Sequence, residues 1–263
     1  MHLSGKVAVV TGSSVGVGRA TAVAFAERGC AVVINYNQSQ SEAEEAAQLC
    51  RAKGAEVIVV HANVSIDADC RRLIQTGVDH FGHLEILVNN AAVTKFIDFG
   101  DLEGMTEEIW LEILRTNLFG NFFCSRAAVP HMRKAGEGAI VNVGSIAGFL
   151  GHGSSIAYAA SKAAIMNMTK CFARTFGPEI RVNGVAPGAI DTRWLRQGIG
   201  EEAFERLREL LRRVTVLQEM LTPEDVADAI LFLVQDARLM TGETIKLDGG
   251  QHLGAPGGPR FRK

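Results

Sequence analysis

Tyr158 and Lys162 are the two residues whose types and spacing most directly suggest chemistry in this chain of 263 residues. They stand four positions apart in the run "SIAYAASKAAI", which is rich in small, helix-favouring residues. On a helix, residues four apart lie on one face, one turn from each other. A phenol loses its proton at a pH of about 10, and a nearby ammonium lowers that pKa. The pair could therefore act as an acid/base group, and the alternative is an ordinary solvated pair on a helix surface.

The elements that must position this pair form an alternating pattern of apolar runs and amphipathic segments. Most of the apolar runs are continuous in Val and Ile, which is typical of strands covered on both faces in a parallel sheet. We therefore expect an α/β fold, a Rossmann-type doubly wound parallel sheet of about seven strands with helices on both faces. The expected strands are 6–12, 30–36, 55–62, 84–91, 138–145, 180–188 and 243–250.

The domain organisation expected from this pattern is simple. No linker or shift in composition interrupts the alternation, so we expect one domain over 1–263. The last helix is expected at 223–236, with Thr222 as its N-cap and Pro223 at its first position. The tail 251–263 has no core pattern and is expected to be irregular.

Composition and charge exclude several classes of partner. The net charge is −2 and no segment is strongly basic, which argues against binding to nucleic acid. No apolar run approaches the roughly 18 residues of a membrane span, and the first residues do not resemble a secretory leader. The five cysteines are scattered and never form C-x-x-C, so we expect reduced thiols, no metal site and a cytoplasmic location.

A glycine-rich stretch, "VTGSSVGVGRA", lies between the first expected strand and the first expected helix. Glycines there permit a tight turn and a close approach of the backbone to a pyrophosphate, while the N–H groups of the helix face the anion. The spacing is G-x-x-x-G-x-G rather than G-x-G-x-x-G. We predict a dinucleotide-binding turn made by Gly12, Ser14, Val15, Gly16, Val17 and Gly18.

The end of the second expected strand, "INYNQSQSE", indicates which dinucleotide is bound. An NAD site usually has an acid there that bonds the ribose hydroxyls. Here Tyr36, Asn37 and Gln38 offer neutral groups, and the first acid is Glu42, already within the next helix. A 2′-phosphate would meet no carboxylate, which favours NADP. No Arg or Lys is at hand either, since Val15 stands where a basic side chain could have reached the phosphate, so NAD remains possible.

Six motifs occur in one order along nearly the whole chain, from about Lys6 to Gly250. Together they resemble the classical short-chain dehydrogenase/reductase family, and the pattern is most similar to members of the 3-oxoacyl-(acyl-carrier-protein) reductase type. Ala92 replaces the usual glycine of "NNAG", and Val17 stands where isoleucine is frequent. The motifs are "TGSSVGVG", "NNAA" at 89–92, Asn117 in "RTNLFGNFF", Ser145 in "VNVGS", "YAASK" at 158–162 and "VAPG" at 185–188.

The resemblance implies a role for each residue of a catalytic tetrad. Tyr158 would be the acid/base, and Lys162 would lower its pKa and bond the nicotinamide ribose. Ser145 would bond the substrate oxygen. Asn117 would lie within a helix and hold a water that relays protons from Lys162 to bulk solvent.

The resemblance also implies further contacts to the cofactor and a substrate pocket. Thr192 would reach the carboxamide of the nicotinamide, although it could equally cap a helix. His152, Phe149, Thr94 and Phe96 would line the pocket. The remaining cofactor-binding positions would be Asn63, Val64, Asn90, Ala91, Pro187, Gly188 and Ile190.

The function implied is an NAD(P)-dependent oxidoreductase that transfers a hydride between a nicotinamide cofactor and a small-molecule secondary alcohol or ketone. A 3-oxoacyl-(acyl-carrier-protein) reductase of fatty-acid synthesis is the alternative, weakened because "KAGEG" and "FGPE" lack the arginines that carrier reductases tend to have there. More remote alternatives are a non-catalytic dinucleotide sensor and an isomerase or dehydratase on the same fold.

The family has its substrate lid at the position of segment 192–214. The arginines of this segment could attract an anionic substrate or a carrier protein, but the glutamates among them favour a solvated amphipathic helix. The helices that carry Asn117 and Tyr158 have apolar outer faces, and the family packs such faces against symmetry mates. The resemblance therefore implies a homotetramer, or at least a dimer.

Overall fold

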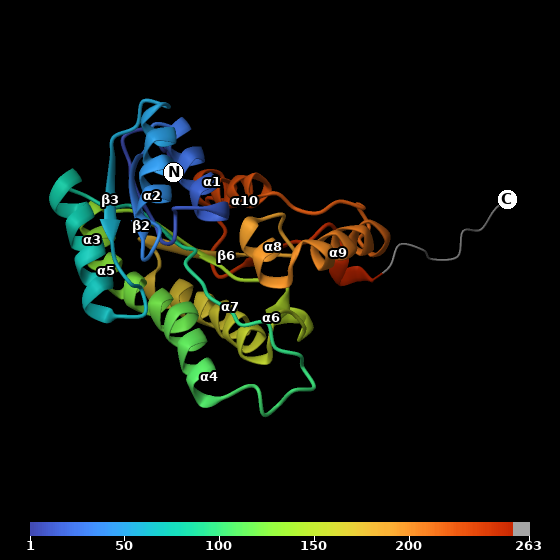
Figure 1. Ribbon diagram of the computed structural model, residues 1–263. Helices are drawn as coiled ribbons and strands as arrows, with labels where there is room; N and C mark the ends of the chain where they lie inside the picture. Colours follow the sequence, from blue (N-terminus) through green and yellow to red (C-terminus); the bar gives the residue numbers. More distant parts are fainter. Residues whose placement is uncertain (255–263) are drawn as a thin grey trace.

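The computed structural model describes residues 1–254, and a parallel sheet of seven strands forms its centre (Figure 1). The strand order is β3-β2-β1-β4-β5-β6-β7, which confirms the predicted doubly wound arrangement. Each strand lies within the segment expected for it. The strands are β1 (Val7–Val10), β2 (Ala31–Tyr36), β3 (Val57–His61), β4 (Ile86–Asn89), β5 (Gly138–Val143), β6 (Ile180–Pro187) and β7 (Thr244–Leu247).

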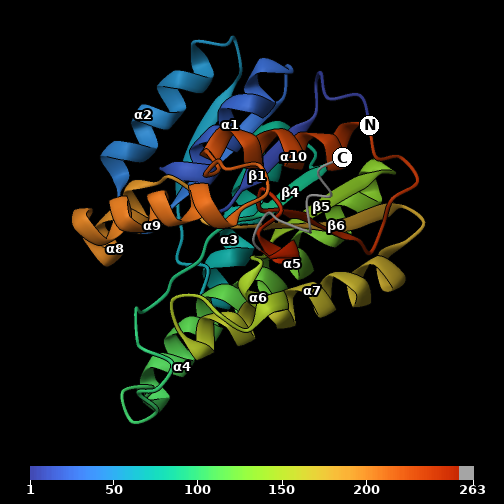
Figure 2. The same ribbon diagram turned by 90° about the vertical axis from the view of Figure 1, so that its right-hand side faces the viewer.

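Helices cover both faces of the sheet (Figure 2). One layer consists of α1 (Gly16–Glu27), α2 (Gln40–Arg51) and α10 (Pro223–Gln235). The other consists of α3 (Asp67–Phe81), α5 (Gly120–Ala135) and α7 (Ile156–Phe176). The predicted cap of α10 is confirmed, because Thr222 and Asp225 form a reciprocal capping box and Pro223 follows directly.

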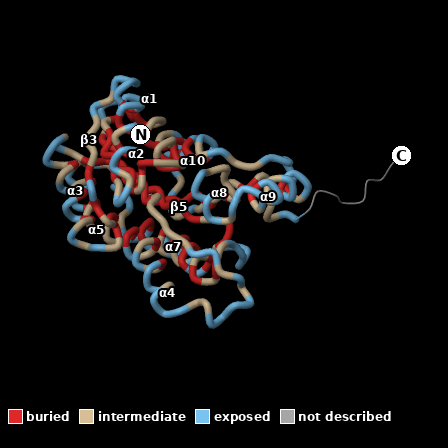
Figure 3. Tube along the Cα trace, viewed as in Figure 1, coloured by how far each residue is buried: buried red, intermediate tan, exposed pale blue. Residues whose placement is uncertain are grey.

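The five inner strands, β2, β1, β4, β5 and β6, are buried because they are sandwiched between these two layers, whereas the edge strands β3 and β7 are only partly buried (Figure 3). Side chains alternate between the layers, so that Val10 packs with Phe25 of α1 on one face and Val9 packs with Leu73 of α3 on the other. This arrangement explains why the strands read as unbroken apolar runs. The sheet therefore gives a rigid base from which the carboxyl ends of its strands present loops.

The order of the strands reverses between β1 and β4, so the loops that follow these two strands diverge. In open α/β sheets a ligand crevice forms at such a point, outside the carboxyl ends of the strands. The loop after β1 leads into α1, and the loop after β4 leads to α4 (Glu107–Leu114). The crevice between them is the expected place for a dinucleotide.

Two helical regions differ from simple expectation. Asn117 lies in a helical path as expected, but Arg115–Phe119 between α4 and α5 is one turn of π-helix. The segment 192–214 is two helices, α8 (Arg193–Ile199) and α9 (Glu201–Val214), which lie together at one side of the molecule (Figure 1). Gly200 separates them with a φ of +82°, a value that favours glycine. The short helix α6 (Ala147–Leu150) precedes α7.

Gln251–Leu253 form one turn of 3₁₀-helix, and the rest of the tail expected to be irregular, 255–263, lies outside the described residues. All five cysteines are free thiols, four of them buried, as expected. Among residues 1–254, no helix is long and apolar enough to cross a membrane.

Candidate active site

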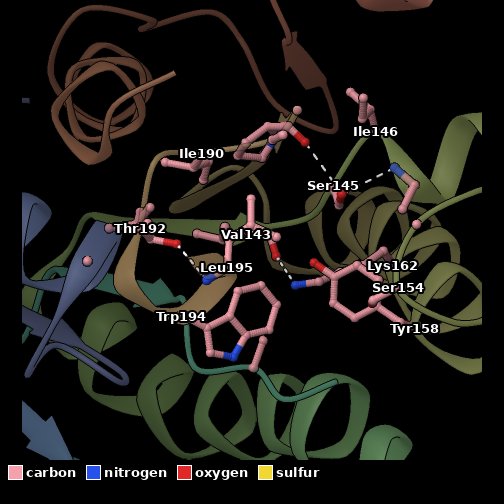
Figure 4. A pocket seen from close by; sticks show the side chains of 18 of the residues that line it. Val143, Ser145, Ile146, Ser154, Tyr158, Lys162, Ile190, Thr192, Trp194 and Leu195 are labelled. Atoms are coloured by element: carbon pink, nitrogen blue, oxygen red, sulfur yellow. Dashed lines mark hydrogen bonds between the residues drawn. The ribbon is translucent and has the colours of Figure 1, made fainter. Parts of the chain in front are cut away.

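A cavity of about 630 Å³ opens at the carboxyl ends of β1, β4, β5 and β6 (Figure 4). The glycine turn, the loop after β5, helix α7 and the lid segment all contribute to its wall. It thus brings together sequence positions that are up to about 240 residues apart. The predicted site residues that line it are Gly12, Val15, Gly16, Val17, Asn90, Ser145, Tyr158, Lys162, Pro187, Gly188, Ile190 and Thr192.

The glycine turn forms one end of the cavity, and two of its glycines are required by close packing. Gly12 has a φ of +62°, and a Cβ there would stand 3.0 Å from the Cα of Ala91. A Cβ on Gly18 would stand 2.3 Å from the carbonyl oxygen of Gly12. The turn therefore keeps its backbone N–H groups close to the start of α1, as a pyrophosphate site requires. Ser14 and Gly18 support the turn from outside the cavity lining.

Three polar residues fasten this turn to the neighbouring strands. The hydroxyl of Thr11 accepts hydrogen bonds from the N–H groups of Asn90 and Ala91 at 2.9 and 3.0 Å. The side chain of Asn90 donates to the carbonyls of Thr11 and Gly12 at 2.9 and 3.1 Å. The Gly12 N–H donates to Oδ1 of the buried Asn35 at 2.9 Å. Thr11 and Asn35 were not among the predicted site residues, because each reads as an ordinary strand-end residue.

Ser145 lies just beyond β5, in the wall of the cavity. Its Oγ accepts a hydrogen bond from the Ala147 N–H at 3.1 Å and donates to the Pro187 carbonyl at 3.4 Å (Figure 4). The turn into α6 thereby fixes the hydroxyl between β5 and β6. Its position in the wall leaves it facing the space that a substrate would enter.

Tyr158 lies in the first turn of α7, and the buried N-cap Ser155 anchors that turn. The Tyr158 N–H donates to Oγ of Ser155 at 3.3 Å. Burial raises the pKa of the Tyr158 phenol to about 12, and a hydrogen bond with Ser145 opposes this shift. The expected lowering of the phenol pKa by Lys162 is therefore not found in the protein alone, because loss of hydration dominates.

Lys162 lies one turn further along α7, with its ammonium 5.5 Å from the centroid of the Tyr158 ring. The residue is 3% exposed, and its Nζ donates to the Val143 carbonyl at 2.8 Å. Burial lowers the pKa of Lys162 to about 8. The alternative of a solvated surface pair is thus wrong, because Lys162 is buried. A buried ammonium with a single carbonyl partner is costly to keep charged, which explains the lowered pKa.

Asn117 is buried in the π-helical turn, away from the cavity lining. Its Oδ1 accepts from the Val93 N–H at 2.8 Å, and its Nδ2 donates to the Val93 carbonyl at 3.0 Å. The same amide donates to Oγ of Ser161 at 3.1 Å. The side chain thus holds the loop after β4 against α7. A π-turn of this kind is frequent at functional sites, because it redirects the backbone.

Tyr36 is the last residue of β2, and Asn37 and Gln38 follow it. All three lie outside the cavity lining, at the side where the adenosine of a dinucleotide is expected. The ring of Tyr36 packs 5.2 Å from that of His61, whose Nε2 is 3.0 Å from the Asn37 carbonyl oxygen. Asn37 and Gln38 are exposed. The loop therefore offers neutral polar groups, as the sequence indicates.

The expectation that no basic group is at hand beside this loop is wrong. Arg193, the first residue of α8, forms an ion pair with Glu42 in the first turn of α2. Arg19 of α1 reaches the same region, with Nη2 3.7 Å from Glu45. Arg193 lies 151 positions from Glu42 in the chain, so no local pattern could reveal this contact.

Asn63 and Val64 follow β3 and also lie outside the lining of the cavity. Oδ1 of Asn63 accepts hydrogen bonds from the N–H and the hydroxyl of Ser65 at 3.0 and 2.8 Å. Val64 is buried, and its carbonyl would stand 2.8 Å from a Cβ on Gly120. Both residues thus shape the loop after β3, and Asn63 is partly exposed.

The residues after β6 close the cavity on the side of the lid. The Gly188 N–H donates to the Leu247 carbonyl at 2.8 Å, and Ile190 pairs with Leu221 in an isolated bridge. Thr192 caps α8, with its Oγ1 accepting from the Leu195 N–H at 3.3 Å (Figure 4). Thr192 also lines the cavity, so the capping role and a contact to a ligand are compatible.

Apolar side chains of the lid segment form the outer wall. The rings of Trp194 and Phe96 lie 6.1 Å apart, and Leu195, Ile199 and Leu207 continue this wall. Phe96 and His152 were predicted to line the cavity, and both do so. Phe149 and Thr94 do not line the cavity. The ring of Phe149 is exposed, and Nζ of Lys246 lies 4.8 Å from its centroid. The hydroxyl of Thr94 is hydrogen-bonded to that of Ser154.

Every arginine of the lid segment is paired with a carboxylate. Arg196 shows the pattern most fully, since its Nη2 is 3.0 Å from Asp191 and its Nη1 is 2.6 Å from Glu201. The expected balance of charges on an amphipathic helix is thus present. The other pairs are Arg193–Glu42, Arg206–Glu202, Arg208–Glu205, Arg212–Glu209 and Arg213–Glu209.

No cluster of His, Cys, Asp or Glu within residues 1–254 has the arrangement of a metal site. The polar groups that line the cavity include the phenol of Tyr158, the hydroxyl of Ser145, the ammonium of Lys162 and the backbone of the glycine turn.

Comparison with known proteins finds relatives that are described as reductases. Residues 12–252 match the family model described as enoyl-(acyl carrier protein) reductase. A ketoacyl reductase assigned to the granaticin polyketide synthase of Streptomyces violaceoruber is 43% identical over 247 residues, covering 94% of this chain and 96% of the relative. The 3-oxoacyl-(acyl-carrier-protein) reductase of Staphylococcus aureus is 35% identical over 250 residues, covering 94% and 98%.

Solved structures agree with these relatives. A protein of Burkholderia xenovorans assigned to the short-chain dehydrogenases/reductases superposes with a TM-score of 0.86 at 34% identity, covering 95% of this chain and 98% of that one. A protein of Sinorhizobium meliloti assigned to the short-chain alcohol dehydrogenases gives a TM-score of 0.87 at 32% identity, with the same coverage.

Proposed function

Because the chain belongs to the short-chain dehydrogenase/reductase family, we propose that it reduces a ketone with NADPH and that Tyr158 donates the proton. Membership makes it an oxidoreductase that transfers a hydride between a nicotinamide cofactor and a secondary alcohol or ketone. The observation that supports the detailed proposal is the position of Tyr158, Ser145 and Lys162 in the wall of one cavity.

The proton chemistry follows from the state of Tyr158. A phenol with a pKa of about 12 stays protonated at neutral pH, so it is ready to act as an acid. An alkoxide formed from a ketone is more basic than a phenolate, so proton transfer from Tyr158 to it is downhill. The Ser145 hydroxyl would exchange its 3.4 Å hydrogen bond to the Pro187 carbonyl for one to the same oxygen, and so hold that oxygen near the phenol. In the reverse direction Tyr158 must first lose its proton.

The residues of the cavity fit a nicotinamide dinucleotide, because the close packing of Gly12 and Gly18 keeps a cradle of backbone N–H groups open. When bound, the cofactor supplies the hydride and, once oxidised, a positive charge. The glycine turn would hold the pyrophosphate, and Asn90 would fix the turn beside the nucleoside. Pro187, Gly188 and Thr192 would position the nicotinamide end, while Lys162 would bond its ribose.

The preference for NADPH over NADH is supported by the surroundings of the loop after β2. Tyr36, Asn37 and Gln38 present no carboxylate to a 2′-phosphate, and the cations Arg19 and Arg193 are close by. Titration of the purified protein with each reduced cofactor, followed by nicotinamide fluorescence, tests this. Tighter binding of NADPH is expected, and tighter binding of NADH would overturn the preference.

The substrate class separates this proposal from the alternative of 3-oxoacyl-(acyl-carrier-protein) reductase. The lid arginines are all paired with carboxylates, so they do not form a free cationic surface for an acidic carrier protein. The apolar wall around Trp194 and Phe96 favours a compact apolar ketone. Steady-state rates with a free cyclic ketone and with an acetoacetyl-carrier protein distinguish the two. A much larger kcat/KM for the carrier-bound substrate would favour the alternative.

We also propose a homotetramer in a reducing, cytoplasm-like compartment. Three large apolar side chains on α4, the π-turn and α5 are exposed, namely Leu111, Phe119 and Phe122, at 39%, 42% and 38%. Exposed apolar residues gathered on adjacent elements are typical of contacts between copies. The free thiols support the compartment. Light scattering should give four times the mass of 28.3 kDa, and Phe122→Glu should lower it.

A further inference from the structure

One ion pair connects the lid segment to the far side of the expected cofactor groove. Arg193 is the first residue of α8, and Glu42 lies in the first turn of α2. The preceding residue, Thr192, lies close to the glycine turn, since its Cγ2 is 3.8 Å from the position of a Cβ on Gly16. The guanidinium therefore extends from the glycine turn toward the loop that follows β2.

Glu42 is charged, and its charge is compensated. The hydrogen bond from Arg193, then one with Ser39, holds the pKa of the Glu42 carboxyl below its usual value, and Arg19 adds to the effect. In an NAD site a carboxylate near the end of the second strand bonds the ribose hydroxyls. Here the nearest acid is instead engaged by an arginine from the lid.

Arg193 is better placed than Arg19 to change partners. Nε of Arg19 donates to the carbonyl of Ser14 at 2.8 Å, so part of that guanidinium belongs to the glycine turn. The side chain of Arg193 is 60% exposed, and among the described residues its guanidinium forms an ion pair with Glu42. A guanidinium presents several N–H donors in one plane, which suits a phosphate better than a single carboxylate.

We propose that Arg193 is the residue that distinguishes NADPH from NADH, by binding the 2′-phosphate, and that Glu42 is its intramolecular competitor. A 2′-phosphate carries about −1.5 to −2 charges at neutral pH, so it attracts the guanidinium more strongly than Glu42 does. Without that phosphate, Glu42 retains Arg193. This inference rests on the proposed preference for NADPH, since it assigns the residue responsible for it.

The experiment measures binding directly, with no turnover. Isothermal titration gives the affinities of 2′,5′-ADP and 5′-AMP, and nicotinamide fluorescence gives those of NADPH and NADH. The variants are Arg193→Gln and Glu42→Gln. Arg206→Gln is the matched control, because Arg206 forms a similar exposed pair with Glu202 on α9.

Arg193→Gln should lower the ratio of 2′,5′-ADP to 5′-AMP affinity on the order of tenfold, because a charge-assisted contact is lost. Affinity for NADH should stay within about twofold. Glu42→Gln should raise the ratio several-fold, because the competitor is weakened. Arg206→Gln should leave the ratio unchanged. The opposite signs of the two variants distinguish a charge competition from a general disturbance of the lid.

A ratio that is unchanged in Arg193→Gln, or an equal loss of affinity for both nucleotides, would overturn the assignment of Arg193. The wild-type ratio of NADPH to NADH affinity tests the cofactor preference separately. If the wild type prefers NADH while Arg193→Gln lowers the ratio further and Glu42→Gln raises it, the preference fails and the assignment of Arg193 stands. If the wild type prefers NADPH and neither variant changes the ratio, only the assignment fails.

Discussion

The ammonium of Lys162 donates a hydrogen bond to the carbonyl oxygen of Val143, the last residue of β5, at a distance of 2.8 Å. The pair joins the helix that carries Tyr158 to the strand that leads to Ser145. It also means that a nearly fully buried cation is held by one neutral acceptor. The lost hydration of the charged ammonium lowers the pKa of Lys162 to about 8.

The first prediction concerns stability as a function of pH. The folded-state pKa of Lys162 lies below its unfolded value of 10.5, so the unfolded chain binds more protons between these pH values and stability rises with pH. Between pH 7.5 and 9.5 this single group contributes about 2 kcal/mol to the rise. Urea unfolding at both pH values should show the rise in the wild type and lack this contribution in Lys162→Met. Parallel pH dependences in the two proteins would contradict the shift.

The second prediction concerns Tyr158. Tyr158→Phe removes the proton donor and keeps the ring, so turnover should fall by about a thousandfold or more. Cofactor affinity should stay within a few-fold, because the phenol faces the substrate space. Steady-state kinetics and fluorescence titration measure the two effects. Substantial residual activity in Tyr158→Phe would rule out the role of Tyr158 as the acid.

The third prediction concerns the glycine turn. A Cβ on Gly18 would meet the Gly12 carbonyl oxygen at 2.3 Å and the Asn90 amide at 2.6 Å. Gly18→Ala should therefore displace the turn and weaken dinucleotide binding about tenfold or more. Gly54→Ala is the control, because a Cβ at Gly54 meets nothing within 4 Å and its φ of +84° causes only local strain. Equal affinities of the two variants in a fluorescence titration would show that the turn tolerates the methyl group.

The fourth prediction concerns the lid. The guanidinium of Arg196 lies 3.9 Å from the ring centroid of the fully buried Phe204, and it also bonds Asp191 before α8. These contacts fasten α8 to α9. Arg196→Leu should therefore raise KM for the ketone several-fold and change cofactor affinity little, which steady-state kinetics and direct titration can measure. Arg213→Leu, on the exposed side of α9, should leave KM unchanged.

Much of the fold could be predicted because its signals are local. The strands are unbroken apolar runs, so the sheet was predicted correctly, and the glycine turn follows the first of them directly, as the sequence indicates. Tyr158, Lys162 and Ser145 were placed in one cavity by motif order. The helical break at Gly200 had a visible signal, since a glycine within an amphipathic pattern permits a positive φ.

The features that could not be predicted depend on contacts between distant segments, on how deeply a side chain is buried, or on the detailed hydrogen bonding of the backbone. The pairing of Arg193 with Glu42 joins residues 151 positions apart, so the basic group beside the ribose loop could not be predicted. In the protein alone burial raises the pKa of Tyr158, and the depth of that burial is not visible in the sequence. The π-turn around Asn117 arises from a shift of one residue in hydrogen bonding, which no residue pattern signals.

The pairing of every lid arginine with a carboxylate has a consequence for how a substrate arrives. Six guanidinium groups face carboxylates on Glu42, Asp191 and four glutamates of α9, so the mouth of the cavity carries little long-range electric field. A neutral ketone neither gains nor loses from such a surface, and its encounter with the site is governed by diffusion alone. The second-order rate of substrate capture should accordingly be almost independent of ionic strength.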